Sequence, residues 1–172
     1  PAKKTVLVLL HGATANGRMW DPVRRILEVR GYRVLTPDLP GHGSRRAQTY
    51  TLEGAVEVVR EAVASVAPAP VVVAGDSLGG YTTMASAGAL PAGQLRGIVA
   101  SGCTLVFEGP ALIPFKIKGF FHKLLVGLVG EKRLLGPRFI KQLGKLGVSE
   151  EDAGALIDAG VNLAAFGDCV RA

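Results

Sequence analysis

The chain has 172 residues, of which 48% are hydrophobic and 20% charged, and its 20 Lys and Arg residues against 14 Asp and Glu residues give a net charge of +6. These values fit one globular domain with a core of its own, and they exclude an intrinsically disordered chain. The basic residues form no patch interleaved with aromatic residues, so the charge favours a solvated surface over nucleic-acid binding.

The chain begins with a short apolar run and a helical pattern. The run 5–10 reads T-V-L-V-L-L and is apolar on both faces, which is typical of a strand buried in a parallel sheet. The helix that follows is expected to have Asp21 as its N-cap, Pro22 at its first position and Gly31 at its C-cap. Its apolar residues share one face: Val23, Ile26 and Leu27.

The same alternation continues downstream. A second strand is expected at 32–36, a helix at about 52–66, a third strand from Val71, and a fourth strand at 97–101. A helix rich in small residues is expected between the last two. Strands that alternate with helices at this spacing predict an α/β fold with a mostly parallel sheet and right-handed crossovers. In such sheets ligands bind beyond the carboxyl ends of the strands.

The stretch from Val71 to Gly80 contains the most informative motif. Its sequence V-V-V-A-G-D-S-L-G-G places Ser77 in a G-x-S-x-G pattern between an expected strand and an expected helix. In a nucleophile elbow of this kind a serine sits at a sharp bend, and glycines are needed because strand and helix approach closely. The alternative is a tight turn that carries a surface serine.

Two upstream motifs meet the elbow at the same expected edge of the sheet: His11-Gly12 after the first strand and D-L-P-G-H-G-S at 38–44 after the second. Together, the three motifs make the stretch 5–103 resemble the N-terminal half of an α/β-hydrolase. The resemblance implies that Ser77 is the nucleophile and that the backbone N–H groups of Ala13 and Leu78 form an oxyanion hole. It also places His11 and Gly12 at the substrate-binding end, with His11 holding the oxyanion loop.

The other two histidines have ordinary structural interpretations. His42 lies in a loop near the same edge and is expected to be a hydrogen-bonded loop residue. His122 falls in an amphipathic helical pattern. We therefore expect none of the three histidines to act as a general base.

After the fourth strand the pattern becomes helical. We expect a core domain at 1–105, an incomplete α/β-hydrolase fold, and a helical cap at 106–172 that shapes an apolar pocket. Within the cap, Ser149 is a good N-cap for a helix with acidic residues in its first turn. The alternatives are a basic amphipathic surface that contacts a membrane, which we regard as the weaker interpretation, and a groove for a partner protein.

The family's order of catalytic residues is nucleophile, acid, histidine, with the last two beyond the cap. No segment up to Ala172 corresponds to them, since Asp152, Asp158 and Asp168 fall in helical cap sequence. We expect sequence beyond residue 172 or a second chain to supply the acid and the histidine and to complete the fold. The 172 residues alone are then expected to be inactive, and a non-catalytic remnant is the remaining alternative.

The sequence thus predicts a serine hydrolase that cleaves a small or medium apolar ester, thioester, amide or lactone through an acyl-enzyme on Ser77. An esterase is the first choice, while C–C cleavage and perhydrolysis stay open. The alternative is a ligand-binding or receptor module that keeps the fold without turnover. We expect no cofactor, no metal and no nucleic-acid partner.

Two further features bear on location. Cys103 and Cys169 do not make a disulfide scaffold and lack a metal-ligand spacing, so we expect free thiols in a reducing compartment. The start of the chain leads directly into a short strand that is too short for the apolar core of a signal peptide. A cytoplasmic protein is the resulting expectation.

Overall fold

The computed structural model describes residues 4–103 and 109–169. Four strands form one sheet in the order β2-β1-β3-β4, and every neighbouring pair is parallel. The strands are β1 (Val6–Leu10), β2 (Arg33–Leu35), β3 (Val71–Asp76) and β4 (Leu95–Ser101). The predicted parallel α/β sheet is confirmed, with strand bounds that differ by one or two residues.

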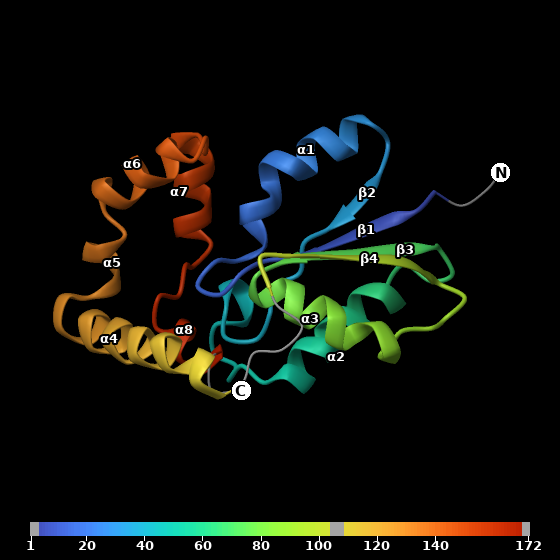
Figure 1. Ribbon diagram of the computed structural model, residues 1–172. Coiled ribbons are helices and arrows are strands. Elements are labelled where there is room, and N and C mark those ends of the chain that lie inside the picture. The colour runs from blue at the N-terminus through green and yellow to red at the C-terminus, as the bar shows by residue number, and fades with distance from the viewer. Residues whose placement is uncertain (1–3, 104–108, 170–172) are drawn as a thin grey trace.

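Helices cover both faces of the sheet (Figure 1). Helix α1 (Asp21–Val29) lies on one face, while α2 (Leu52–Ala64) and α3 (Leu78–Ser86) lie on the other. Short 3-10 turns join these elements: Gly17–Trp20, Gly43–Arg45, Ala87–Ala89 and Gly109–Leu112. Because the helices lie on the faces of the sheet, the carboxyl ends of the strands lie at its edge, where the loops that follow them begin.

The main core lies between the sheet and α2. Strand residues that point to this side are β-branched or leucine, which suits a pleated surface buried on its inner face. They meet the apolar side of α2, where Val59 and Val63 are fully buried. Thr51 caps this helix, since its hydroxyl accepts from the Gly54 N–H at 3.0 Å. The core thus fixes the position of β1 and β3, the two central strands.

Helix α1 departs from the prediction in two ways. Asp21 is its first residue rather than its N-cap, a position held by Trp20, and the Asp21 carboxylate pairs with Arg18 at 2.9 Å. The apolar face of α1 also stays partly open, because Val23 is 41% exposed and Ile26 is 55% exposed. Gly31 follows the helix with φ +82°, which agrees with the predicted helix end.

Five helices follow β4 in the described residues, and we refer to them as the cap: α4 (Ile113–Val129), α5 (Glu131–Leu134), α6 (Pro137–Lys145), α7 (Glu150–Asp158) and α8 (Ala165–Cys169). They gather beyond the carboxyl ends of the strands (Figure 1). A second small core at Leu135, Leu156 and Val161 joins α6 and α7, with Phe139 and Leu143 packed against it. Ser149 caps α7 as predicted. The proposed boundary at 105/106 lies outside the described residues.

None of the described helices is long and apolar enough to cross a membrane.

Candidate active site

Ser77 sits at a strained bend between β3 and α3. Its backbone has φ 53° and ψ −114°, a combination that an L-residue rarely adopts. The bend is held on both sides, because the Ser77 N–H donates to the Ser101 carbonyl at 2.8 Å and the Ser77 carbonyl accepts from the Tyr81 N–H at 3.1 Å. A sharp strand-to-helix turn of this kind projects the serine side chain away from the sheet.

Glycines make the bend possible. A Cβ on Gly75 would collide with the carbonyl of Gly79, and a Cβ on Gly79 would collide with the carbonyl of Leu10. The start of α3 therefore lies directly against β3 and β1. This close approach is the physical reason for the small residues on either side of Ser77.

The loop after β1 passes beside Ser77. A Cβ built on Gly12 would lie 3.5 Å from the Ser77 Cβ, so backbone and serine are neighbours here. The loop is held by its own contacts: the Gly12 N–H donates to the Met19 sulfur at 3.4 Å, and the Ala15 N–H donates to the Gly12 carbonyl at 3.3 Å. Thr14 adopts φ +71°, which turns the loop sharply.

Two backbone amides next to Ser77 are free within the described part of the chain. The Leu78 N–H is the first of α3 and has no acceptor inside that helix. No hydrogen bond of the Ala13 N–H to another described residue is present. Together with the N-terminus of α3, these donors suit the charge of an oxyanion that forms on a carbonyl attacked by Ser77.

His11 holds this loop through hydrogen bonds of its ring. Its ring is fully buried, its Nδ1–H donates to the Gly12 carbonyl at 2.8 Å, and its Nε2 accepts from the Leu39 N–H at 3.0 Å. Burial lowers the pKa of His11 to about 4, so the ring is neutral at physiological pH. The geometry assigns His11 to positioning Gly12, and both ring nitrogens are engaged in that role rather than facing a substrate.

His42 supports the same loop through a hydrogen bond to Thr14. It is fully buried, its Nδ1–H donates to the Pro40 carbonyl at 2.8 Å, and its Nε2 accepts from the Thr14 N–H at 3.2 Å. Burial lowers the pKa of this histidine as well. The rings of His11 and His42 lie 5.0 Å apart, so the two form one neutral clamp across the loops after β1 and β2.

Asp38 adds a charged clamp that the sequence analysis did not assign. One oxygen accepts from the Gly17 N–H, and the other accepts from the N–H and the hydroxyl of Ser44, all at 2.8 Å. Half-burial by itself would raise the pKa of Asp38, but the hydrogen bonds from Gly17 and Ser44 outweigh it and lower the pKa. The D-L-P-G-H-G-S motif contains the signal, since an Asp before a glycine-rich turn commonly accepts backbone N–H groups.

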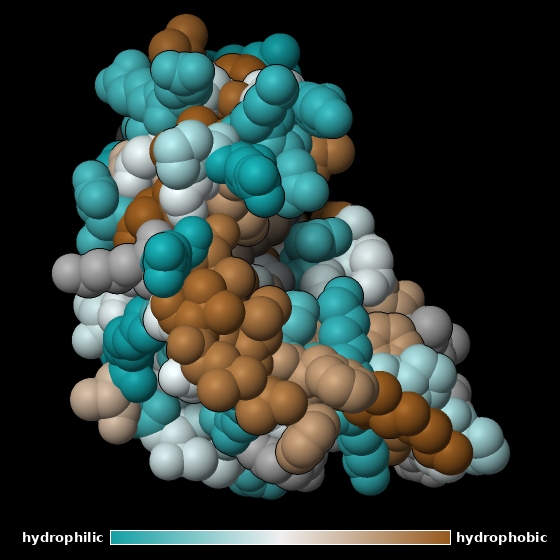
Figure 2. Space-filling view, turned by 90° about the vertical axis from the view of Figure 1, so that its left-hand side faces the viewer, coloured by the Kyte–Doolittle hydropathy of each residue, from teal (hydrophilic) through white to brown (hydrophobic). Residues whose placement is uncertain are grey.

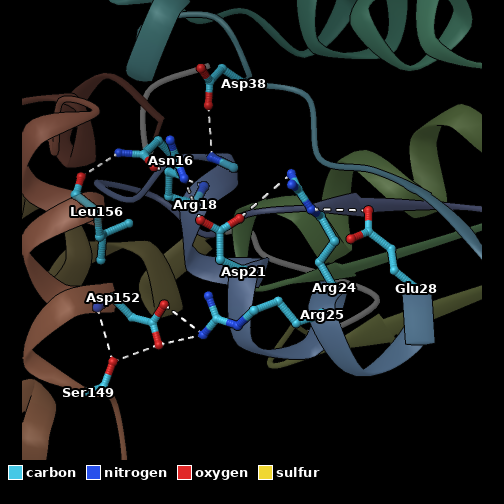
Figure 3. Close-up of polar contacts among 11 residues, drawn as sticks. Asn16, Arg18, Asp21, Arg24, Arg25, Glu28, Asp38, Ser149, Asp152 and Leu156 are labelled. Atoms are coloured by element: carbon cyan, nitrogen blue, oxygen red, sulfur yellow. Dashed lines mark hydrogen bonds and ion pairs between the residues drawn. The ribbon is translucent and has the colours of Figure 1, made fainter. Parts of the chain in front are cut away.

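Two asparagines tie the cap to these loops, and sequence reasoning missed both. Asn16 is fully buried; its side chain accepts from the Arg18 N–H at 3.0 Å and donates to the Leu156 carbonyl of α7 at 2.8 Å (Figure 3). The Asn162 N–H donates to the Thr14 carbonyl at 2.9 Å, and its side chain donates to the Gly41 carbonyl at 2.7 Å. The cap is therefore seated on the loops after β1 and β2.

Ion pairs reinforce this seat. Arg25 of α1 binds both carboxylate oxygens of Asp152 at 2.8 Å, and the Ser149 hydroxyl donates to the same carboxylate (Figure 3). Arg46 pairs with Glu131 at the start of α5. Asp152 is thereby committed to a structural pair.

An apolar cavity of about 290 Å³ opens between the loop after β1, α1 and the cap. Its polar lining residues are Thr14, Arg18 and Asp152. The remaining lining is apolar: Ala15, Met19, Pro22, Phe139, Leu143, Val148, Leu156 and Val161. This volume is at the lower end of the range for small-molecule pockets.

Within the described residues no side chain hydrogen-bonds to the Ser77 hydroxyl. His122 lies on α4 with its ring 5.5 Å from Phe166, and Asp168 pairs with Lys123 at 2.7 Å. In the described ranges no group of three or more His, Cys, Asp and Glu residues could hold a metal ion. What the site presents is a strained serine with two free amides, while the apolar cavity is lined by Thr14 and Ala15 of the neighbouring loop and not by Ser77.

This arrangement defines a class: a parallel α/β protein with a serine at a strained strand-to-helix bend, at the carboxyl edge of its sheet. The model of the alpha/beta hydrolase family matches residues 7–168, and the chain belongs to that family. The resemblance seen in the sequence is thereby confirmed.

Three comparisons place the chain within this family. It is 35% identical over 118 residues to the magnesium-chelatase 30 kDa subunit of Rhodobacter capsulatus, covering 67% of this chain and 40% of that protein. It is 33% identical over 110 residues to lipase LipV of Mycobacterium tuberculosis, covering 63% and 41%. The chain thus spans about two fifths of the length of these relatives. The match to the solved structure of the bottromycin epimerase BotH covers 99% of this chain and 64% of that chain. Its TM-score is 0.67 and the identity is 21%, so this likeness shows the fold.

Proposed function

We propose that this chain carries the nucleophile half of a serine hydrolase that cleaves a small or medium apolar carboxylic ester. The observation that carries the proposal is the backbone of Ser77 at φ 53° beside the free amides of Ala13 and Leu78. A strained serine is maintained where its position matters, and donors fixed by the backbone stabilise an oxyanion without rearranging during the reaction.

The substrate class follows from the cavity. Its lining is apolar apart from three residues, and its Thr14 and Ala15 wall continues directly from Ala13. Ser77, Ala13 and Leu78 do not line this cavity, so an acyl or alkyl group bound there would extend past Thr14 and Ala15 to bring its carbonyl to Ser77. The likeness to a lipase supports an ester as the bond cleaved, while a thioester, amide or lactone would use the same groups.

The reaction also requires a base. In the described residues His11 and His42 are neutral, buried and fully hydrogen-bonded, so neither can take the proton of Ser77. We propose that the histidine and its acid partner come from polypeptide outside these 172 residues. In this scheme the histidine takes the hydroxyl proton as Ser77 attacks, and then returns it to the leaving alcohol.

A fluorophosphonate probe tests both statements at once. The rate of labelling at Ser77 is measured by mass spectrometry while free imidazole is added as a substitute base. We expect slow labelling that rises with the imidazole concentration and is absent in Ser77→Ala. Rapid labelling without imidazole would show that the chain contains its own base.

A second function is a binding module without turnover. The observation that favours it is that cavity and cap seat are complete in this chain, whereas no described base reaches Ser77. The match to a chelatase subunit, a protein not named as a hydrolase, points the same way. Binding of an apolar ligand in the cavity, with no labelling of Ser77 at any imidazole concentration, would favour this function over the first.

A further inference from the structure

Helix α4 has one side that faces the protein. At Gly119 its backbone lies against Gly167 of α8, so closely that a Cβ on Gly119 would be 2.7 Å from the Gly167 Cα. Phe115 and His122 flank this contact and meet the ring of Phe166. The packed side of α4 is therefore the side of Gly119.

The opposite side of α4 is apolar and exposed. With about 100° per residue, the side chains on it share an arc roughly 100° wide: Ile113, Ile117, Phe120, Phe121, Leu124 and Leu128. All six are exposed, and Leu128, Phe120 and Phe121 reach 76%, 65% and 59%. Figure 2 looks onto the cap side of the molecule and shows hydrophobic side chains gathered in one patch with hydrophilic side chains around it. A patch of this kind marks an interaction surface.

Positive charge surrounds this face. Lys116 and Lys123 flank the arc on one edge and Lys118 flanks it on the other, while α4 contains no acidic residue. The segment 109–148 holds eight of the chain's 20 basic residues and one of its 14 acidic residues. The segment 109–148 thus has a net charge of +7, compared with +6 for the whole chain.

Part of this charge is engaged within the protein. In the described part of this segment Lys123 pairs with Asp168, and the Lys118 ammonium lies 5.2 Å from the centre of the Phe166 ring. The single acidic residue, Glu131, is paired with Arg46 of the core. Arg133, Arg138, Lys141 and Lys145 are exposed. This segment therefore presents a positive surface that a negatively charged partner would complement.

We propose that the cap docks on an anionic lipid surface, with α4 lying in the plane of the interface and its apolar arc inserted between the headgroups. An exposed apolar arc with lysines on its edges is the pattern of an interfacial helix, and the lysines can extend to lipid phosphates. A second copy of the chain fits less well, because it would bring two strongly positive segments together. The centres of protein–protein interfaces are also depleted of lysine.

The test is co-sedimentation of the 172-residue chain with vesicles. One set contains phosphatidylcholine alone, and the other contains equal parts of phosphatidylcholine and phosphatidylglycerol. We expect binding to the anionic vesicles that weakens as salt is added, and much weaker binding to the neutral ones. Binding to both sets alike, or to neither, would overturn the proposal.

Two uncharged double variants locate the contact. Phe120→Ser with Leu128→Ser should weaken binding at least about tenfold, because both side chains lie on the exposed arc. The matched control, Ile26→Ser with Val29→Ser, removes two exposed apolar side chains from α1 and should bind as the parent does. Circular dichroism checks that both variants are folded.

Equal binding by the two double variants would contradict the assignment to α4. Sedimentation velocity covers the competing occupant. A dimer that dissociates in the Phe120→Ser, Leu128→Ser variant would show that a second copy covers this face and that the lipid proposal is wrong. None of these outcomes depends on Ser77 or on hydrolysis, so the proposal and the proposed function stand or fall separately.

Discussion

Replacing Asn16 by Ala should loosen the seat of the cap. This side chain is fully buried and makes two hydrogen bonds, one that caps the turn at Arg18 and one to the carbonyl of Leu156 in α7. Loss of an N-cap costs about 1 kcal/mol. The lost bond to α7 leaves a buried carbonyl unsatisfied, which costs about 1–3 kcal/mol. The expected loss in the free energy of unfolding is therefore about 2–4 kcal/mol, or about 5–15 °C in Tm.

Urea unfolding followed by circular dichroism measures this loss. The matched control is Thr51→Ala, which removes an exposed N-cap with a single hydrogen bond and should cost about 1 kcal/mol. If Asn16→Ala costs no more than Thr51→Ala, the bond to α7 contributes nothing and the seat of the cap on the loop after β1 is refuted.

Further predictions concern the elbow and the clamp, and each is read from urea unfolding. Gly79→Ala should lower the free energy of unfolding by about 3 kcal/mol, because its Cβ collides with the Leu10 carbonyl. Gly127→Ala lies in open space on α4 and should raise the free energy of unfolding by about 1 kcal/mol. The reverse order of the two variants would contradict the close packing of α3. Ser77→Gly should be about 1–2 kcal/mol more stable than Ser77→Ala, because glycine adopts φ 53° without strain; equal stabilities would mean that the bend is relaxed. The pKa of His11 is about 4 in the folded chain and 6.5 in the unfolded chain, so the unfolded chain binds a proton more readily. The free energy of unfolding is therefore at its full value above pH 6.5 and falls by about 3 kcal/mol as the pH is lowered to 4. A flat profile over that window would show that the ring is not buried as described.

The sheet and the elbow could be read from the sequence because local chemistry fixes them. The apolar run of β3 followed by Gly75 and Gly79 permits little else, since the close approach of α3 leaves no room for a Cβ at either glycine. The pattern at α1 was less informative. A face formed by Val23 and Ile26 predicts burial, but how much of it is covered depends on which segments pack there, and both side chains stay partly exposed.

The contacts between cap and core could not be predicted from the sequence. Asn16 and Leu156 are 140 positions apart, and no periodicity pairs a side-chain amide with a distant helix carbonyl. The bond from Asn162 to Thr14 has the same character. The role of Asp38 was easier to predict, because an acidic residue before a glycine-rich turn commonly accepts backbone N–H groups.

A crystal structure of the Ser77 phosphonate adduct tests the central claim most directly. The phosphonyl oxygen stands in for the oxyanion, and we predict that it lies about 2.7–3.1 Å from the backbone nitrogens of both Ala13 and Leu78. An adduct whose oxygen points to solvent, or amides of Ala13 and Leu78 that donate to other carbonyls instead, would contradict the assignment of Ser77 as a hydrolase nucleophile.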